Sequence, residues 1–197
     1  MLNHLVEQIS GSAWSYLLIF GFAYLDALLP VVPSETAVIT GGVLAGAGKM
    51  NLPAIIVLAA AGAFAGDNTL YLIGRRYGER AKQRFFSGEK GRKRTAWAEG
   101  QLQKRGGELI VVARFIPGGR TLVCLSAGAT RMAWPRFALF DVIAGVTWAL
   151  YAGLLGYFGG KAFEHEPWKG LLLAFGIAFS ITGGVEVVRW LRRRRRA

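Results

Sequence analysis

The hydrophobic positions of the chain fall into long, almost uncharged stretches. Residues 14–29, 52–74, 137–160 and 170–185 each contain at most one charged residue. At the helical rise of ~1.5 Å per residue, the stretch 52–74 would be about 34 Å long, which is enough to cross the hydrocarbon core of a bilayer. The pattern therefore predicts four membrane-spanning helices.

Two further apolar stretches are interrupted by residues that break helices. Residues 37–48 are too short to cross a membrane and follow a Pro-Val-Val-Pro segment, and residues 109–130 hold a Pro-Gly-Gly break between two arginines. Proline and glycine at membrane depth are tolerated where the backbone is buried in protein or lines a cavity. We therefore expect re-entrant hairpins at about 30–50 and 108–132.

Composition agrees with a membrane protein and argues against other classes. Hydrophobic residues make up 53% of the chain, and 24 Lys and Arg against 12 Asp and Glu give a net charge of +12. The apolar fraction is too high for a disordered chain, and the single cysteine, Cys124, excludes a disulfide-stapled domain. A soluble nucleic-acid-binding protein would not carry such apolar stretches, so we expect no nucleic-acid partner.

Basic residues are concentrated in two segments, and these set the expected orientation. The loop 75–107 holds eleven of the 24 Lys and Arg residues, and the tail 189–196 holds six. The positive-inside rule puts both on the cytoplasmic side. The spans 137–160 and 170–190 supply the two crossings between them, so 109–130 is expected to enter and leave the membrane on the same side.

The chain is expected to have three regions: an N-terminal segment 1–13, a membrane domain 14–190 and a basic cytoplasmic tail 191–197. The first segment has no Lys or Arg, unlike the start of a cleavable signal peptide, so we expect it to be retained. The expected location is a bacterial-type plasma (inner) membrane, crossed several times. The loop 75–107 is expected to be solvated and to lie along anionic lipid.

An internal repeat relates the two halves of the chain. Residues 50–53 resemble residues 132–135, and glycines follow at matching distances, Gly74 with Gly156 and Gly78 with Gly160. The first span must end inside and the second must begin inside, so the predicted fold is all-α, with two inverted repeats of a re-entrant hairpin and a helix, plus additional transmembrane helices. Such repeats are typical of secondary transporters with a site near the midplane. Chance similarity between Gly- and Pro-rich segments is the alternative.

Charged residues lie at both interruptions. Glu35 is in the first, Arg114 and Arg120 are in the second, and Asp26 precedes the first. An arginine at the centre of a membrane helix costs roughly 2.5–3.5 kcal/mol, which favours one shared polar site over four separate buried charges. The alternative is that Glu35–Arg120 and Asp26–Arg114 are merely structural ion pairs.

The residue types at these positions favour an anionic ligand. The two arginines match paired phosphate oxygens, and a half-helix opening at Gly119 and Thr121 would add its free N–H groups. Asp26 and Glu35 are the candidate groups for proton exchange. The only histidines, His4 and His165, lie near an end and in a loop, so no metal and no other cofactor is expected.

Several other residues are weaker candidates. Pro33 and Pro117 at the breaks, together with Asp67 and Tyr71 within a span, are candidates to line a cavity, although hydrogen bonding between helices explains Asp67 and Tyr71 at least as well. Asp141, close to the start of a span, is expected at the membrane interface.

These features resemble the DedA family, whose members are also called SNARE-associated or VTT-domain membrane proteins. The resemblance runs from about residue 26 to residue 160, and it rests on Pro33-Ser34-Glu35, on Gly66-Asp67-Asn68 with Tyr71, Gly74-Arg75 and Gly78, and most of all on Arg114-Phe115-Ile116-Pro117-Gly118-Gly119-Arg120-Thr121. It implies that two acids and two arginines are needed for function, and these correspond to Asp26, where the family commonly has Glu, and to Glu35, Arg114 and Arg120.

The resemblance also implies a flippase or transporter for phosphate-bearing lipids, polyprenyl phosphate or a phospholipid, often with proton dependence. The expected partners are therefore membrane lipids and protons, and the expected protein is not an enzyme. A proton-coupled exchanger of a small oxyanion or drug, a membrane enzyme acting on lipid phosphates, and an assembly protein without turnover are the alternatives. The sequence does not distinguish a monomer from a homodimer.

Overall fold

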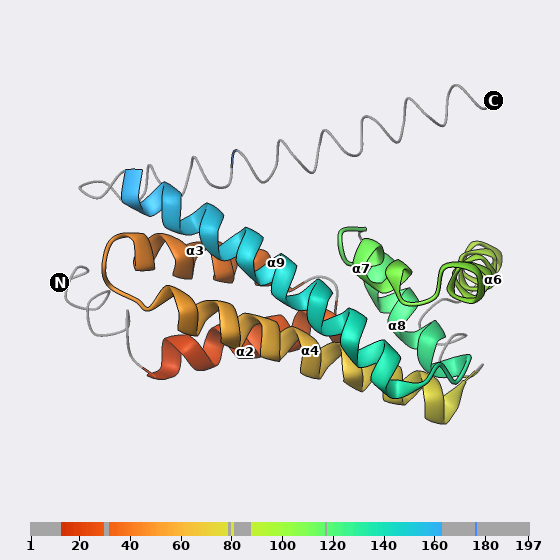
Figure 1. Cartoon of the computed structure of the whole chain (residues 1–197). Helices are drawn as coiled ribbons and strands as arrows, with labels where there is room; N and C mark the ends of the chain where they lie inside the picture. Colours follow the sequence, from red (N-terminus) through yellow and green to blue (C-terminus); the bar gives the residue numbers. More distant parts are fainter. Residues whose placement is uncertain are drawn as a thin grey trace, which may run out of the picture.

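The computed structural model describes residues 13–29, 32–78, 80, 88–116, 118–162 and 176. Within these residues the chain is all-helical, as predicted (Figure 1). The helices are α2 (Ala13–Leu28), α3 (Ser34–Gly46), α4 (Leu52–Tyr77), α6 (Gly88–Arg105), α7 (Glu108–Arg114), α8 (Gly119–Ala129) and α9 (Trp134–Ala162).

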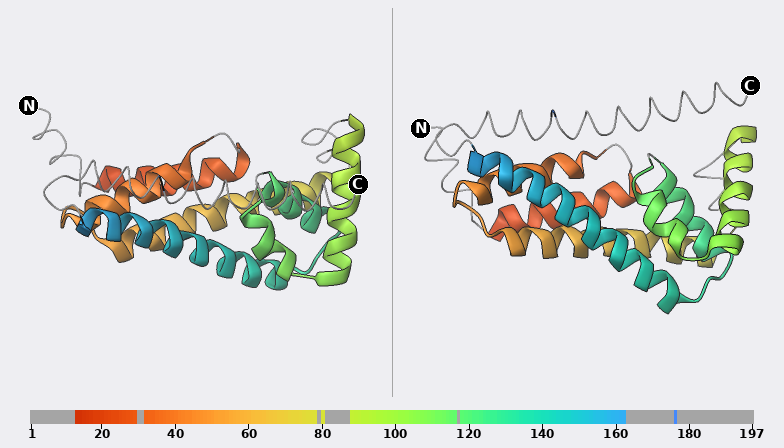
Figure 2. Two further views of the ribbon diagram at one scale, coloured as in Figure 1. Left: turned by 90° about the horizontal axis from the view of Figure 1, so that it is seen from above. Right: turned by 45° about the horizontal axis from the view of Figure 1, so that its top comes forward.

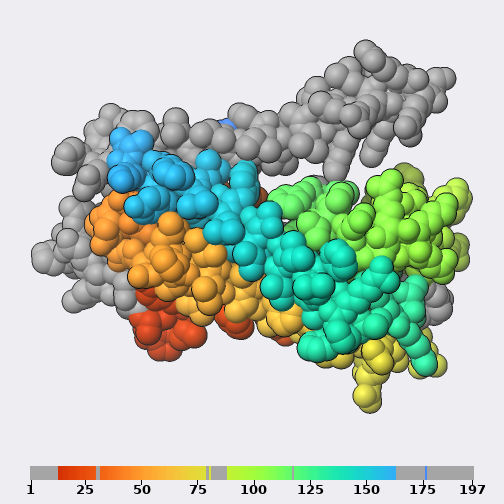
Figure 3. Space-filling view, in the orientation of Figure 1, coloured from red at the N-terminus to blue at the C-terminus, as the bar shows by residue number. Residues whose placement is uncertain are grey.

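Two of the predicted spans correspond to helices that are long and apolar enough to cross a membrane, α4 with 26 residues and α9 with 29. Helix α2 covers the first predicted span but has only 16 residues. The fourth predicted span, 170–185, lies outside the described residues except for Gly176. Figure 1 shows α4 and α9 running in opposite directions along the molecule, and Figure 3 shows both on one face.

The ends of α4 follow from local sequence. The Asn51 side chain caps the first turn, because its Oδ1 accepts a hydrogen bond of 2.9 Å from the Ala54 amide, and Pro53 occupies an early position where its missing N–H costs nothing. At the other end Gly78 adopts a φ of 49°, and its amide donates to the Gly74 carbonyl. The helix stops at Gly78 because residues with a side chain rarely adopt that backbone conformation.

The second interrupted stretch forms two short helices, α7 and α8, joined by a turn. Gly118 in this turn has a φ of 67°, in the left-handed region that favours glycine. With 7 and 11 residues, neither helix is long enough to cross a bilayer alone. The break is therefore where the sequence predicted it, while the membrane face from which each hairpin enters stays a prediction.

Two of the short helices pack mainly on the long helix of the other half: α3 lies against α9, and α8 lies against α4, whereas α7 packs on α9 and α8. Glycines make both contacts close. A side chain at Gly74 would collide with the carbonyl of Leu125 on α8, and one at Gly156 would collide with the carbonyl of Ile39 on α3. Small residues allow backbones to approach in this way in membrane proteins.

The glycine pairs predicted from the repeat are only partly equivalent. Gly74 and Gly156 have the same role, since each receives the backbone of a short helix. Gly160 does likewise against the Val43 carbonyl, whereas its predicted counterpart Gly78 ends α4 and has no neighbouring atom within 4 Å of where a side chain would begin. The register of α3 on α9 matches that of α8 on α4, since Gly42 meets the Gly153 carbonyl as Gly128 meets the Tyr71 carbonyl. The difference at Gly78 arises because α4 ends there.

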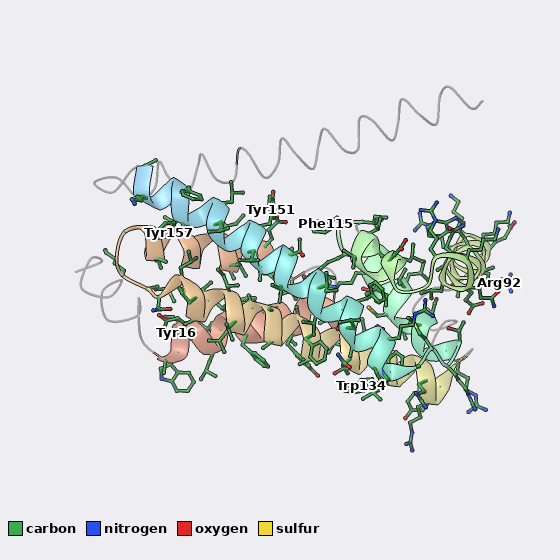
Figure 4. The ribbon with its side chains drawn as sticks, in the orientation of Figure 1. Tyr16, Arg92, Phe115, Trp134, Tyr151 and Tyr157 are labelled. Carbon is green, nitrogen blue, oxygen red and sulfur yellow. The ribbon has the colours of Figure 1, made fainter. Side chains whose placement is uncertain are left out.

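The basic loop contains a helix, α6, which the sequence analysis did not predict. Figure 2 shows α6 crossing one end of the bundle, and it contacts α8 and α7. Its buried face includes Ala98 and Leu102, while Trp97 points away and is exposed. Part of the loop therefore packs against the bundle, and the arginines of α6, such as Arg92, remain exposed (Figure 4).

The apolar core consists of two clusters, and α4 contributes to both. One includes Leu70 and residues of α6, α7 and α8, and the other includes Ala63 and residues of α2, α3 and α9. Asp67 lies on α4 between Ala63 and Leu70, and it is completely buried. Among the described residues, the buried ion pairs lie around Asp67.

Candidate functional site

Four helix ends meet around the middle of α4. They are the end of α2 with Asp26, the start of α3 with Ser34, the end of α7 with Arg114 and the start of α8 with Arg120. Because the chain breaks in the interior instead of at its surface, polar side chains from the interrupted helices reach one place. Asp67 on α4 is the residue that they surround.

Arg114 forms the most deeply buried ion pair of the described residues. Its Nη1 donates to Oδ2 of Asp67 at 2.8 Å, and the side chains of Arg114 and Asp67 are 2% and 0% exposed. The guanidinium carbon also lies 5.0 Å from the centre of the Trp148 ring on α9, a cation–π contact. Arg114 thus ties α7 to both long helices.

Arg120 has a different environment, between two acids and partly open to the outside. Its Nε lies 3.2 Å from Oδ1 of Asp67, and its Nη2 donates to Oδ2 of Asp26 at 3.4 Å. The contact with Asp67 is an ion pair without the alignment of a hydrogen bond, since Oδ1 of Asp67 has no hydrogen-bond partner. The side chains of Arg120 and Asp26 are 14% and 21% exposed, so Arg120 is the accessible arginine.

The Ser34 hydroxyl completes the accessible part of the site. It donates to Oδ2 of Asp26 at 2.6 Å, the same oxygen that Arg120 approaches. Ser34 is the first residue of α3, so this bond joins the end of α2 to the start of α3 across the first break. Asp26 is therefore held in place for Arg120 by a residue of the interrupted helix.

The site contains hydrogen-bonding capacity that the described residues do not use. Nε and Nη2 of Arg114 are buried and have no partner, and Oδ1 of Asp141 is in the same state. Buried polar groups normally have partners, because an unpaired one costs ~1–3 kcal/mol. Unused donors on a buried arginine are consistent with a site that receives water or an anionic group.

The ion pairs named in the alternative, Glu35–Arg120 and Asp26–Arg114, are not the pairs that form among the described residues. Asp26 pairs with Arg120, and Arg114 pairs with Asp67, which the sequence analysis treated only as a candidate to line a cavity. Glu35 has no ion pair within the described part of the chain and interacts electrostatically with Asp26, a like charge. The reason is geometric, because the α7–α8 turn meets the middle of α4 and carries both arginines to Asp67.

Asp67 could have been found from its position. It is the only charge in the 23 residues of the stretch 52–74, near the middle of the longest early span, where an unpaired carboxylate would be costly. The sequence analysis instead gave most weight to the charges at the two breaks. Depth within a span was the more informative signal here.

The other predicted residues are in different environments. The hydroxyl of Thr121 donates to the Ala27 carbonyl at 3.4 Å, and the Gly119 amide donates to the Ile116 carbonyl at 2.8 Å, so these two groups already have partners. Pro33 precedes α3 and lines a groove beside the site. Pro117 lies outside the described residues.

Tyr71 is part of the core and not of the arginine site. Its hydroxyl donates to the Met132 carbonyl at 2.5 Å and accepts from Nη1 of Arg75 at 2.8 Å. Its ring stacks on Phe137 with 4.5 Å between the ring centres. Tyr71 therefore fixes α4 to the beginning of α9, which agrees with the alternative of hydrogen bonding between helices.

Asp141 is buried inside the protein, while its position at the membrane interface stays a prediction. Asp141 is 1% exposed, and its Oδ2 accepts a hydrogen bond of 3.3 Å from Nδ2 of Asn68. The side-chain Oδ1 of Asn68 in turn accepts from Nε1 of Trp134, at the start of α9, at 2.8 Å (Figure 4). Asp141 lies within α9, seven residues after its start at Trp134, and its side chain points toward α4.

A groove about 310 Å³ in volume runs along α2 and α3, next to the first break. Its walls are mostly apolar, with Leu18 and Phe22 from α2 and Ala37 and Leu44 from α3, and Pro33 at the break. Pro33 in this lining directly precedes Ser34, whose hydroxyl bonds Asp26, so the groove lies next to the first break.

Comparison with known proteins adds a family assignment. The VTT domain family model matches residues 32–158. An uncharacterized membrane protein of Mycobacterium tuberculosis is 34% identical over 188 residues, covering 92% of this chain and 81% of its own length. Protein DedA of Escherichia coli is 28% identical over 201 residues, covering 98% and 92%. No solved structure matches. The matched region includes Asp67 and both arginines.

Proposed function

Because the chain belongs to the VTT-domain family of membrane proteins, which includes protein DedA, we propose that it is a transporter that carries a phosphate-bearing lipid head group across the bilayer. The membership agrees with the resemblance seen in the sequence. The substrate class and the coupling to protons are proposals from the geometry of the site.

One observation carries the proposal: Arg120 is a partly exposed cation held between two carboxylates at a helix break. The contacts of the Arg120 guanidinium group with the two carboxylates, 3.2 and 3.4 Å, are longer than the 2.8 Å contact of Arg114. Arg120 is therefore held less tightly by its acidic partners. A phosphate can form two parallel hydrogen bonds with an arginine, and these compete well with such contacts. Arg120 is therefore the residue proposed to bind the head group.

Arg114 has a supporting role in this proposal. It is nearly inaccessible, but it neutralises Asp67 and leaves Arg120 free to exchange partners. Its two unpaired donors can reach a phosphate only if α7 or Trp148 shifts, which would accompany a change in exposure of the site. When the head group leaves, Arg120 forms its ion pair with Asp26 again.

The groove along α2 and α3 favours a lipid over a small oxyanion. An apolar groove of about 310 Å³ beside a charged site suits a molecule with a charged head and a hydrocarbon chain. The head group would stay at Arg120 while the chain remains in the groove or in lipid. A free oxyanion would make no use of this groove.

The proposal can be tested with polyprenyl phosphate in proteoliposomes. Phosphatase added outside removes phosphate only from the outer leaflet, so loss of the inner-leaflet pool reports flipping. We expect wild type to expose the inner pool, Arg120→Ala to match protein-free vesicles, and Arg92→Ala, which changes an exposed arginine of α6, to match wild type. Flipping by Arg120→Ala at the wild-type rate would contradict the proposal.

The same vesicles distinguish the alternatives. Release of inorganic phosphate without added phosphatase would indicate an enzyme that acts on lipid phosphates. Uptake of labelled inorganic phosphate into vesicles, with no movement of the lipid, would indicate an oxyanion exchanger. Each outcome replaces the lipid proposal with a defined rival.

A further inference from the structure

We propose that α6 is an interfacial helix, and that one face of it binds the head groups of anionic phospholipids at the membrane surface. This face, called the basic face below, consists of Lys90, Arg94, Trp97 and Lys104, and all four residues are exposed. None of them belongs to the site around Asp67. The inference therefore does not depend on the proposed transport.

Helix α6 lies at the end of the bundle where α4 ends and α9 begins. A side chain added at Gly106, directly after α6, would collide with the guanidinium group of Arg136 in the first turn of α9. In Figure 2, α6 runs across the bundle, whereas α4 and α9 run along it. Since α4 and α9 are long and apolar enough to cross a bilayer, a helix that runs across their ends lies parallel to the membrane surface.

Exposed aromatic and basic residues indicate that this end of the bundle lies at the boundary between lipid and water. Arg76 and Tyr77 are exposed at the end of α4, and Trp134 and Arg136 are exposed at the start of α9. Trp and Tyr are enriched at membrane–water interfaces, and Arg side chains near helix ends extend to the head groups. Helix α6 is therefore at the level of the phospholipid head groups.

The sequence of α6 gives it a buried face and a separate basic face. Ala98 and Leu102 are buried against the bundle. At ~100° per residue, the four residues of the basic face lie within an arc of about 80° on another side of the helix. Glu89 and Glu99, the two acids of α6, fall outside this arc. The basic face therefore carries three positive charges and no acid.

The chemistry of the basic face fits an anionic lipid surface better than a nucleic acid or an acidic protein. Trp97 lies between the basic residues of this face and is 53% exposed. In the head-group layer, an indole ring contacts hydrocarbon while its N–H group stays among polar groups. The negative potential of an anionic leaflet attracts Lys and Arg side chains held at the membrane surface. Both kinds of side chain on the basic face are therefore stabilised by the same lipid surface.

Quenching of Trp97 fluorescence tests the surface in the full-length protein. The protein is placed in nanodiscs of phosphatidylcholine alone, or of phosphatidylcholine mixed with phosphatidylglycerol, and acrylamide is added to the water. The contribution of Trp97 is the difference between wild type and Trp97→Phe. We expect phosphatidylglycerol to protect Trp97 from acrylamide and high salt to reverse the protection, because salt screens exposed charges. Equal accessibility of Trp97 in the two kinds of nanodisc overturns the proposal.

Two arginines of α6 provide a matched pair of variants. Both are exposed, but Arg94 is on the basic face, whereas Arg92 lies about 160° away around the helix. Arg94→Gln should weaken lipid binding roughly fivefold, the effect of one charge near an anionic surface, so that half of the protection needs more phosphatidylglycerol. Arg92→Gln should behave as wild type. Each variant is measured with and without Trp97→Phe, and equal effects of the two changes overturn the proposal.

Other partners give a different result in the same nanodiscs. Protection of Trp97 by a short DNA duplex or by polyglutamate, without any effect of phosphatidylglycerol, indicates a soluble acidic partner and overturns the lipid proposal. The quenching experiment measures no transport. Its failure therefore leaves the proposed movement of lipid head groups untouched, and a protein that moves no lipid can still show the protection.

Discussion

Breaking the buried ion pair of Arg114 and Asp67 should strongly lower the free energy of unfolding. The loss should differ between removing the arginine and removing the carboxylate. Removing one partner of a buried ion pair typically costs about 3–5 kcal/mol, because the remaining charge is left uncompensated. In Arg114→Ala, Asp67 keeps Arg120 at 3.2 Å, so the loss should lie near the lower value. In Asp67→Ala, Arg114 keeps no carboxylate within ion-pair distance among the described residues, so the loss should be larger.

A double-mutant cycle in the folded membrane protein measures the pair. Unfolding by SDS in mixed micelles, followed by tryptophan fluorescence, gives the free energy of unfolding for wild type, the two single variants and the double variant. The double variant should lose less than the sum of the singles by about 1–3 kcal/mol, as for other residues in direct contact.

The exposed pair of Lys93 and Glu89 on α6 is the matched control. Its distance is 2.6 Å, shorter than the 2.8 Å of the buried pair, but both side chains are 75% exposed. Its cycle should give no more than about 0.5 kcal/mol, because solvent screens an exposed pair. Additive losses for Arg114 and Asp67, or equal coupling in the two pairs, would refute the reasoning that burial makes this contact decisive.

Two further predictions concern packing and hydrogen bonding. Gly74→Ala should lower the free energy of unfolding by about 1–3 kcal/mol, since the new methyl group meets the Leu125 backbone, whereas Gly21→Ala, with no atom within 4 Å, should be neutral or stabilising in the same SDS titration. Tyr71→Phe should cost about 1–3 kcal/mol, since it leaves the buried Met132 carbonyl without its donor, and an unchanged titration would contradict that hydrogen bond.

Much of the architecture could be predicted because it depends on local sequence. The spans at α4 and α9 follow from apolar length, and the turn between α7 and α8 follows from the glycines at 118 and 119. Helix α6 was missed because its residues are mostly polar, and only Ala98, Leu102 and a few small residues mark its buried face. A loop and a helix of this composition have similar patterns of hydrophobic and polar residues. They are distinguished only by their tertiary contacts.

The sequence by itself determined that the protein is helical and built for a membrane, that two of its helices are interrupted, and that arginines lie at the second interruption. Those properties depend on hydrophobicity, on helix-breaking residues and on charge, all of which are set by residues close together in the sequence. Only the tertiary structure decided that Asp67 lies between both arginines and that Asp141 is buried and bonded to Asn68 of α4. Those pairings depend on where helices cross and which way each side chain points, and residues far apart in the chain set both.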